Sequence, residues 1–289
     1  MQVKSGLIAI VLLCGSFRAM AQQNDAVSCK RKADSSFIQG NLNEAEKWYN
    51  RVLAIRTQQK NYPEVTAALT DLAALESTKG NSRKAVQLGQ KALQLLPKFQ
   101  NDTIAFRVLS FLSIFYDAVY RRVSAEFFAE KADALIDKSK LVQTRDEALY
   151  HFLDRGLRVL QQNDFRVADT YFQKTLSISR RDPTFDLGVL YNNMALSLSY
   201  QKKYTAALKY YELATRNRIN NNAERVWLNL AECYLSLNNL PAAQKTIEMA
   251  WQNYLRNQSG GKNPPNRQFE QRYWRALGLY YKAVTKLPN

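Results

Sequence analysis

Small residues recur at a fixed register along this chain, and no other feature of the sequence limits its fold as strongly. Alanine occupies six positions spaced 36 to 43 residues apart, at Ala45, Ala85, Ala125, Ala168, Ala207 and Ala243. The residues twelve positions before them are all small, namely Ala33, Ala73, Ser113, Gly156, Ala195 and Ala231. The residues seven positions after them are small or β-branched, namely Val52, Ala92, Ala132, Thr175, Ala214 and Ala250. A period of this length indicates a repeat protein.

Each repeat is predicted to be a hairpin of two antiparallel helices. A small residue where two helices cross lets their axes approach, while large residues such as Leu72, Tyr116 and Trp227 fill the space between neighbouring helices. The chain has only 10 Gly and 7 Pro in 289 residues, too few to supply the turns of an all-β fold. The fold class is therefore expected to be all-α.

Turn residues stand midway through four of the six repeats, where the first helix must end and the chain must reverse. They are Gly40-Asn41, Gly80-Asn81, Asn163-Asp164 and Asn238-Asn239. The third and fifth repeats have Tyr120-Arg121-Arg122 and Lys202-Lys203 instead, so their turns are not predicted by composition.

The repeats resemble the tetratricopeptide family, whose signature is W-x2-L-G-x2-Y followed by A-x3-F and P. The segment Trp274 to Tyr281 matches the first half of this signature, and the sixth repeat matches it partly with Trp227, Leu230, Ala231 and Tyr234. The repeats here exceed the family's usual length of about 34 residues. HEAT or armadillo repeats of about 40 to 47 residues are the rival interpretation, but they do not explain three phased small positions.

This resemblance implies a right-handed superhelix, an α-solenoid of about six hairpins followed by a C-terminal helix. The array is predicted over residues 22–257, with units at about 26–59, 64–98, 104–138, 146–181, 186–220 and 222–256. A loop over 258–268 and a capping helix or half repeat over 269–287 complete the chain. The capping role is the simpler interpretation of this last helix, and the alternative is that the chain is the front part of a longer signalling protein.

Residues 1–21 have the three parts of a secretory signal peptide: the basic Lys4, an apolar stretch over residues 6–13, and a small-x-small site that predicts cleavage after Ala21. The mature chain is therefore expected to be periplasmic or secreted, with no transmembrane segment. A lipoprotein is the alternative, because Cys14 follows Val11-Leu12-Leu13 and Cys29 follows Ala26-Val27-Ser28. Leu13 is too large for the position before a lipidated cysteine, and polar residues precede Cys29, so both sites fit poorly.

The residues that catalysis or metal binding would need are scarce. His151 is the only histidine, and although Asp154 lies three residues from it on a predicted helix, no nucleophile accompanies the pair. A position at the surface or at a groove edge is expected for His151. Gly260-Gly261-Lys262 lacks the other residues of a phosphate-binding loop. The sequence predicts no enzyme, no catalytic residue, no cofactor and no metal site, and an enzyme using His151 and Asp154 is the minor alternative.

The chain is strongly basic, with a net charge of +16. Lys4 and Arg18 lie in the predicted signal peptide, and the net charges of residues 22–104, 105–182 and 183–289 are +4, +2 and +8. The resemblance implies a concave groove in which polar residues of the first helices hold a peptide backbone or a carboxylate. The candidates are Asn192, Asn193, Arg225, Asn229, Arg272 and Arg275. Leu196 and Ala276 depart from the family's pattern, because polar residues would be expected there. The alternative is that these are solvated charges on an ordinary basic surface.

The function expected from these observations is a non-enzymatic extracytoplasmic scaffold that binds a protein or peptide partner, expected to be acidic, as a sensor or adaptor in signalling. A lipid-anchored envelope assembly factor is the alternative. Nucleic acid is not expected as a partner, because the chain is predicted to be exported and most of its aromatic residues fall at core positions. The sequence does not indicate an oligomeric state.

Overall fold

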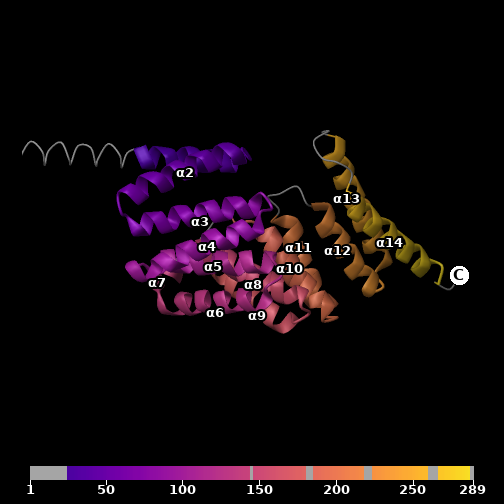
Figure 1. Ribbon diagram of the computed structural model, residues 1–289. Coiled ribbons are helices and arrows are strands. Elements are labelled where there is room, and N and C mark those ends of the chain that lie inside the picture. The colour runs from indigo at the N-terminus through magenta and orange to yellow at the C-terminus, as the bar shows by residue number, and fades with distance from the viewer. Residues whose placement is uncertain (1–24, 144–145, 180–184, 218–222, 260–265, 287–289) are drawn as a thin grey trace, which may run out of the picture. The chain divides into compact units, whose positions relative to one another are not determined.

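The computed structural model describes residues 25–143, 146–179, 185–217, 223–259 and 266–286, and within these ranges the regular secondary structure is helical, with no β-strand. Contacts between Cα atoms divide the chain into two compact units, residues 1–145 and 146–289. Both units are stacks of helix hairpins (Figure 1). The predicted signal peptide and the Gly260-Gly261-Lys262 segment lie outside the described residues.

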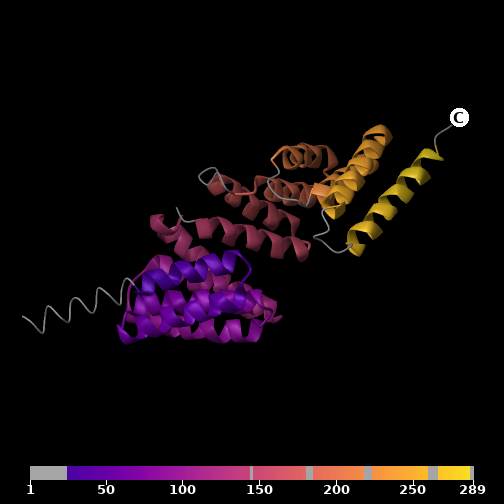
Figure 2. The same ribbon diagram turned by 90° about the horizontal axis from the view of Figure 1, so that it is seen from above.

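In the first unit, successive helices alternate in direction and each contacts the next (Figures 1 and 2). A helix over residues 25–38 is followed by α2 (Leu42–Gln58), α3 (Tyr62–Thr78), α4 (Ser82–Leu95), the short η1 (Leu96–Lys98), α5 (Asp102–Ala118), α6 (Arg122–Lys138) and α7 (Lys140–Gln143). The hairpins pair residues 25–38 with α2, α3 with α4, and α5 with α6.

The second unit repeats this arrangement and ends on a helix that has no described partner helix after it. Its helices are α8 (Asp146–Gln161), α9 (Phe165–Ser179), α10 (Leu187–Tyr200), α11 (Tyr204–Arg216), α12 (Ala223–Ser236), α13 (Leu240–Ser259) and α14 (Arg267–Val284). The hairpins are α8 with α9, α10 with α11, and α12 with α13. Helix α14 begins two residues before its predicted start, because the Asn266 side chain caps it by accepting a hydrogen bond from the backbone N–H of Phe269 at 3.1 Å.

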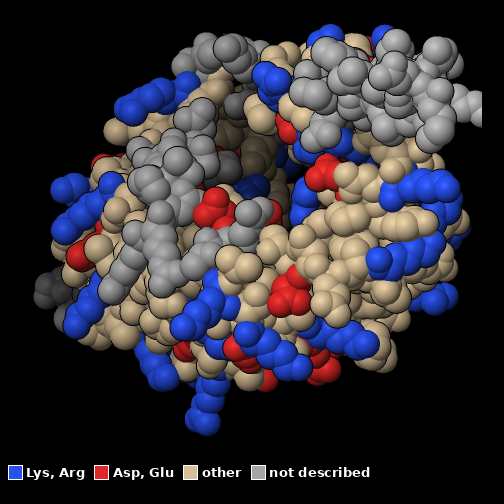
Figure 3. All heavy atoms as spheres, turned by 90° about the vertical axis from the view of Figure 1, so that its left-hand side faces the viewer, with Lys and Arg blue, Asp and Glu red and all other residues tan. Residues whose placement is uncertain are grey.

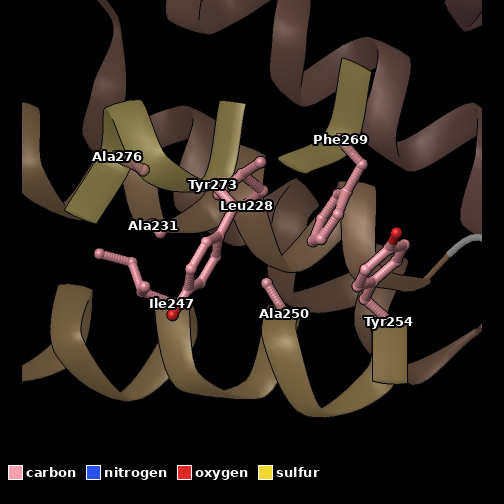
Figure 4. Packing of buried hydrophobic residues seen from close by; sticks show 8 residues of the cluster. All are labelled: Leu228, Ala231, Ile247, Ala250, Tyr254, Phe269, Tyr273 and Ala276. Carbon is pink, nitrogen blue, oxygen red and sulfur yellow. The ribbon is translucent and has the colours of Figure 1, made fainter. Parts of the chain in front are cut away.

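The repeated small residues are buried in every hairpin, from Ala33 to Ala250. Gly156 shows why size matters, because a Cβ atom placed on it would lie 2.5 Å from Cε1 of Phe172 on the partner helix. In the last hairpin, Ala231 and Ala250 lie between larger residues of α12, α13 and α14 (Figure 4). The predicted all-α fold of stacked helix hairpins is confirmed, and the small positions are buried between packed helices, as close helix packing requires.

The turns inside the hairpins share one geometry, including the two for which the sequence shows no turn residue. Gly40, Gly80, Asn163 and Asn238 have positive φ, as their residue types predict. Tyr120 (φ 59°) and Lys202 (φ 60°) adopt the same left-handed conformation. The hairpin imposes it, since the N–H groups of Tyr120 and Arg121 donate to the carbonyls of Asp117 and Tyr116 and so close the end of α5.

Candidate functional site

A groove of about 850 Å³ on the second unit gathers most of the binding residues predicted from the sequence. Those that line it are Asn192, Arg225, Asn229, Arg272 and Arg275. Asn193 is not among the lining residues, and its side-chain amide donates instead to the carbonyl of Val189 in its own helix at 2.9 Å. The geometry therefore brings together every predicted residue except Asn193.

Three helices supply these side chains. Asn192 lies on α10, Arg225 and Asn229 lie on α12, and Arg272 and Arg275 lie on α14. Residues three or four apart share one face of a helix, which gives α12 and α14 a pair of polar residues each. Since α12 contacts both α10 and α14, the polar faces of the three helices adjoin and form one wall.

A chain of hydrogen bonds connects the three helices across the groove. The Asn229 Nδ2 donates to Oδ1 of Asn192 at 2.8 Å, and its Oδ1 accepts from Nη2 of Arg272 at 2.8 Å. Asn229 is 6% exposed, so both ends of its amide are satisfied within the protein. The network also orients the amide, because the opposite orientation would place its NH₂ group against the guanidinium donors. Asn229 therefore positions Arg272 and Asn192.

The arginines of the groove differ in whether an acidic side chain neutralises their charge. Arg272 pairs with Glu232 at 3.0 Å. Arg225 and Arg275 are exposed and, among the residues that the structure describes, pair with no acidic side chain. Three arginines and one glutamate line the groove and give it a net positive charge of two. A concave positive surface raises the local concentration of anions, and a guanidinium can hold a carboxylate through two parallel hydrogen bonds.

Several charged residues on the first helices of the first unit compensate one another, although the exposed Arg31 has no acidic partner among the described residues. Lys30 pairs with Asp34 at 2.6 Å and with the buried Asp71 at 3.2 Å. Arg107 pairs with the other carboxylate oxygen of Asp71. Acidic and basic side chains are likewise interspersed over the face seen in Figure 3. In the first unit, Lys30, Asp71 and Arg107 thus neutralise one another, whereas Arg225 and Arg275 of the groove have no acidic partner among the described residues.

The inner part of the groove is uncharged at neutral pH. Tyr211 and Cys233 are buried there, and the Cys233 thiol lies 3.4 Å from the carbonyl oxygen of Tyr204, to which it donates. Loss of hydration on burial raises the pKa of Cys233 to about 11 and also raises the pKa of Tyr211. A thiol with a raised pKa is a poor nucleophile. The groove therefore combines a charged rim with an uncharged base in which the Cys233 thiol stays protonated at neutral pH.

Several lining residues were not predicted from the sequence: Ser199, Tyr200, Tyr204, Glu232 and Leu279 among them. Helical periodicity could have identified Glu232, because it lies three residues after Asn229 and shares its face. The tyrosines carry no such signal, since aromatic residues occur both in the core, as at Tyr211, and at exposed positions, as at Tyr200. Of the two departures from the family's pattern, Leu196 lines the groove as an apolar contact, whereas Ala276 is buried in the core.

The expectation that His151 lies at the surface or at a groove edge is wrong. His151 is 2% exposed, because it belongs to the wide buried face of α8 with Ala148, Phe152 and Arg155. The carboxylate of Asp154 pairs with Arg158 at 2.9 Å. Neither residue lines the groove.

Within the part of the chain that the structure describes, no three His, Cys, Asp or Glu side chains lie close enough together to hold a metal ion. None of its helices combines the length and the apolar character that crossing a membrane requires.

Comparisons with known proteins agree with this architecture. Residues 26–98 and residues 198–256 each match a family model described as tetratricopeptide repeat. The second match includes Arg225 and Asn229 of the groove. No significant match was found among curated protein sequences.

Solved structures with a similar fold come from several proteins. BtubC (BKLC) from P. vanneervenii is 17% identical with a TM-score of 0.62, and the alignment covers 85% of this chain and 94% of that chain. pilF from Pseudomonas aeruginosa is 19% identical with a TM-score of 0.62, covering 83% and 99%. A chain of the APC/C hetero-tetramer Cut9-Hcn1 is 15% identical with a TM-score of 0.66, covering 87% and 43%. Identities this low support similarity of the fold alone.

Proposed function

Because this chain belongs to the tetratricopeptide-repeat family, we propose that it is a non-enzymatic scaffold that holds an acidic segment of a partner protein in the groove of its second unit. Repeats of this family suggest a scaffold for protein–protein interaction. The observation that carries the more specific proposal is the pair of uncompensated arginines, Arg225 and Arg275, on either side of the fixed Asn192–Asn229–Arg272 network.

The groove offers an extended acidic segment two kinds of contact. Arg225 and Arg275 can each bind a carboxylate, and Arg272 is oriented to take part without first losing conformational freedom, since Asn229 and Glu232 already hold it. Apolar side chains of the segment can pack against Leu196 and Leu279. Because the charges lie at the rim, we expect salt to weaken the interaction by slowing association.

The test is a titration of fluorescently labelled acidic peptides, measured by polarisation at low and high salt. We expect Arg225→Glu and Arg275→Glu each to lower affinity by about 10- to 100-fold, as the loss of a charge-assisted hydrogen bond of about 1.5–3 kcal/mol implies. Lys209→Glu is the matched control, because Lys209 is exposed on α11 and does not line the groove. Equal affinity for all three variants would show that general basicity, and not the groove, attracts the peptide.

We also propose that the protein works outside the cytoplasm, on the sequence of residues 1–21 alone. Mass spectrometry of the mature protein should find a chain that begins at Gln22. A lipid-anchored envelope assembly factor, the alternative, would begin at an acylated Cys14 or Cys29. Cys29 is 3% exposed within the helix over residues 25–38, so a chain beginning there would lack the first turn of that helix.

A sensor or adaptor role in signalling is the most specific form of this proposal. Co-purification of the exported protein with a signalling enzyme would support it, provided that Arg225→Glu abolishes the association.

A further inference from the structure

Helix α14 has the sequence register of a first helix but lacks the cover that first helices have elsewhere in the chain. Trp274, Gly278 and Tyr281 follow the spacing of Trp227, Ala231 and Tyr234 on α12. Ala231 is 0% exposed, and its two aromatic neighbours are partly buried. On α14, by contrast, Trp274 and Tyr281 are each 59% exposed, and Gly278 is exposed as well.

The second helix of each hairpin provides that cover. The helix that covers α12 is α13, whose Ala243, Ile247 and Ala250 are buried at 0–1% exposure. On α14, a Cβ atom added to Gly278 would meet no atom within 4 Å. The opposite face of α14, with Phe269, Tyr273 and Ala276, packs into the core of the last hairpin (Figure 4). Within the described residues, α14 is therefore half of a hairpin with its second-helix site open.

Residues with a spacing of four and then three, such as Trp274, Gly278 and Tyr281, share one face of a helix, and a glycine between two aromatics leaves a shallow notch there. The six completed hairpins show that a helix with small side chains can approach closely at this register. The shape of the open face therefore fits an amphipathic helix with small residues along its contact side.

Charge indicates what kind of helix fits. Arg275 and Lys282 are exposed and lie seven residues apart along one side of the open face, and Lys286 is exposed in the turn that follows the helix. Glu270 is the single acidic residue of α14, and it accepts a hydrogen bond from Tyr254 at 2.5 Å. A second copy of α14 would bring these cations close to their own counterparts, which is unfavourable, whereas an acidic flank would complement them.

We propose that the open face of α14, defined by Trp274, Gly278 and Tyr281, docks an amphipathic helix of a partner protein that has small residues on its contact side and acidic residues on its flank. The partner helix takes the place on α14 that α13 takes on α12. The three defining residues do not line the groove, but Arg275 beside them does, so the two sites adjoin on α14.

A peptide copied from α13 is the probe. It spans residues 240–256 and carries Gln244→Glu, Lys245→Glu and Gln252→Glu, which keep the small contact residues and make its exposed side acidic. Binding of the labelled peptide to the full chain is measured by fluorescence polarisation, and size-exclusion chromatography with light scattering reports the oligomeric state. The unmodified peptide serves as the charge control.

We expect one peptide per chain and an affinity at least about tenfold lower for Trp274→Ala, as for a central aromatic contact. Gly278→Gln should cause a similar loss by filling the notch, while Gly278→Ala should bind like the original, because Ala231 has that size on α12. Lys282→Glu should weaken binding of the acidic peptide and strengthen binding of the unmodified one. Since the space around Gly278 is open, thermal unfolding of both glycine variants should show an intact fold.

Three results would overturn the proposal: no binding at millimolar peptide, equal binding to Gly278→Gln and Gly278→Ala, or a dimer of the chain that Gly278→Gln dissociates. The last result would identify the occupant as a second copy. Arg225→Glu serves as a cross-check, because it should weaken groove ligands but leave this peptide unaffected.

Discussion

Gly156 and Gly278 both lie inside helices, yet the same substitution by alanine is expected to change stability in opposite directions. The two sites differ in what a new methyl group would meet. At Gly156 it would lie 2.5 Å from Cε1 and 2.7 Å from Cδ1 of Phe172, whereas at Gly278 nothing lies within 4 Å. The pair therefore separates the packing role of a small residue from the intrinsic helix preference of alanine.

The magnitudes follow from two opposing effects. Alanine favours a helix interior over glycine by about 1 kcal/mol, which applies at both sites. At Gly156 the ring of Phe172 would have to move by nearly an ångström to reach ordinary van der Waals distance, and this ring is fully buried in the core of α8, α9 and α10. Overpacking of this kind costs about 1–3 kcal/mol. We expect Gly156→Ala to lower the free energy of unfolding by about 1 kcal/mol, and Gly278→Ala to raise it by about 0.5–1 kcal/mol.

The stability of both variants can be measured by urea unfolding followed by far-UV circular dichroism. Their urea midpoints can be compared directly if the dependence of the unfolding free energy on urea concentration is the same for both. Phe172→Leu in the Gly156→Ala background should recover part of the loss, because the smaller side chain relieves the contact, and the double-mutant cycle isolates that coupling. If Gly156→Ala is as stable as the original chain or more stable, the reasoning is wrong, and Gly156 is not needed to let its helix pack closely against the partner helix.

Three further predictions concern the turns and the groove. Tyr120→Gly should raise the free energy of unfolding, measured by urea titration, by about 0.5–1 kcal/mol. Tyr120 is 91% exposed and holds a left-handed conformation that glycine adopts freely. An unchanged urea midpoint would contradict the strain argument. Asn229→Ala should lower the free energy of unfolding by about 1–2 kcal/mol, because it removes two buried hydrogen bonds. It should also weaken peptide binding, whereas the matched control Asn193→Ala should leave peptide binding unchanged. In a background that carries both Cys14→Ala and Cys29→Ala, Cys233 in the native protein should react with a disulfide reagent at pH 8 about 100-fold more slowly than in urea, since its pKa is raised to about 11. The unfolded thiol ionises at lower pH than the folded one, so stability should fall as pH rises toward 11, and Cys233→Ala should reduce this slope.

The helix hairpins were predictable from the sequence because their determinants are local and periodic. A residue such as Ala231 or Ala243 must be small whatever the rest of the chain does, since it lies where two consecutive helices cross. The groove residues Arg225 and Asn229 were predictable for a related reason, because their spacing assigns them to one face of one helix. In these cases a short stretch of sequence carries the whole constraint.

The left-handed turns at Tyr120 and Lys202 were not predictable in this way. Neither residue type favours that conformation, and the hairpin imposes it because the packed helices require the reversal at that point. The burial of His151 is similar, since it depends on how wide a face of α8 the surrounding helices cover and not on the preference of histidine.

The sequence by itself therefore determined the all-α repeat, the register of its small residues, and the helix faces on which the arginines lie. Only the tertiary structure decided that Glu232 compensates Arg272 while Arg225 and Arg275 remain uncompensated, because these distances join helices about 40 residues apart in the chain. It also decided that Gly278 is exposed and Ala231 is buried, although both occupy the same place in the same signature. The physical reason is that a helix's own sequence fixes which side chains share a face, whereas the neighbouring helices decide whether that face is covered, paired or open.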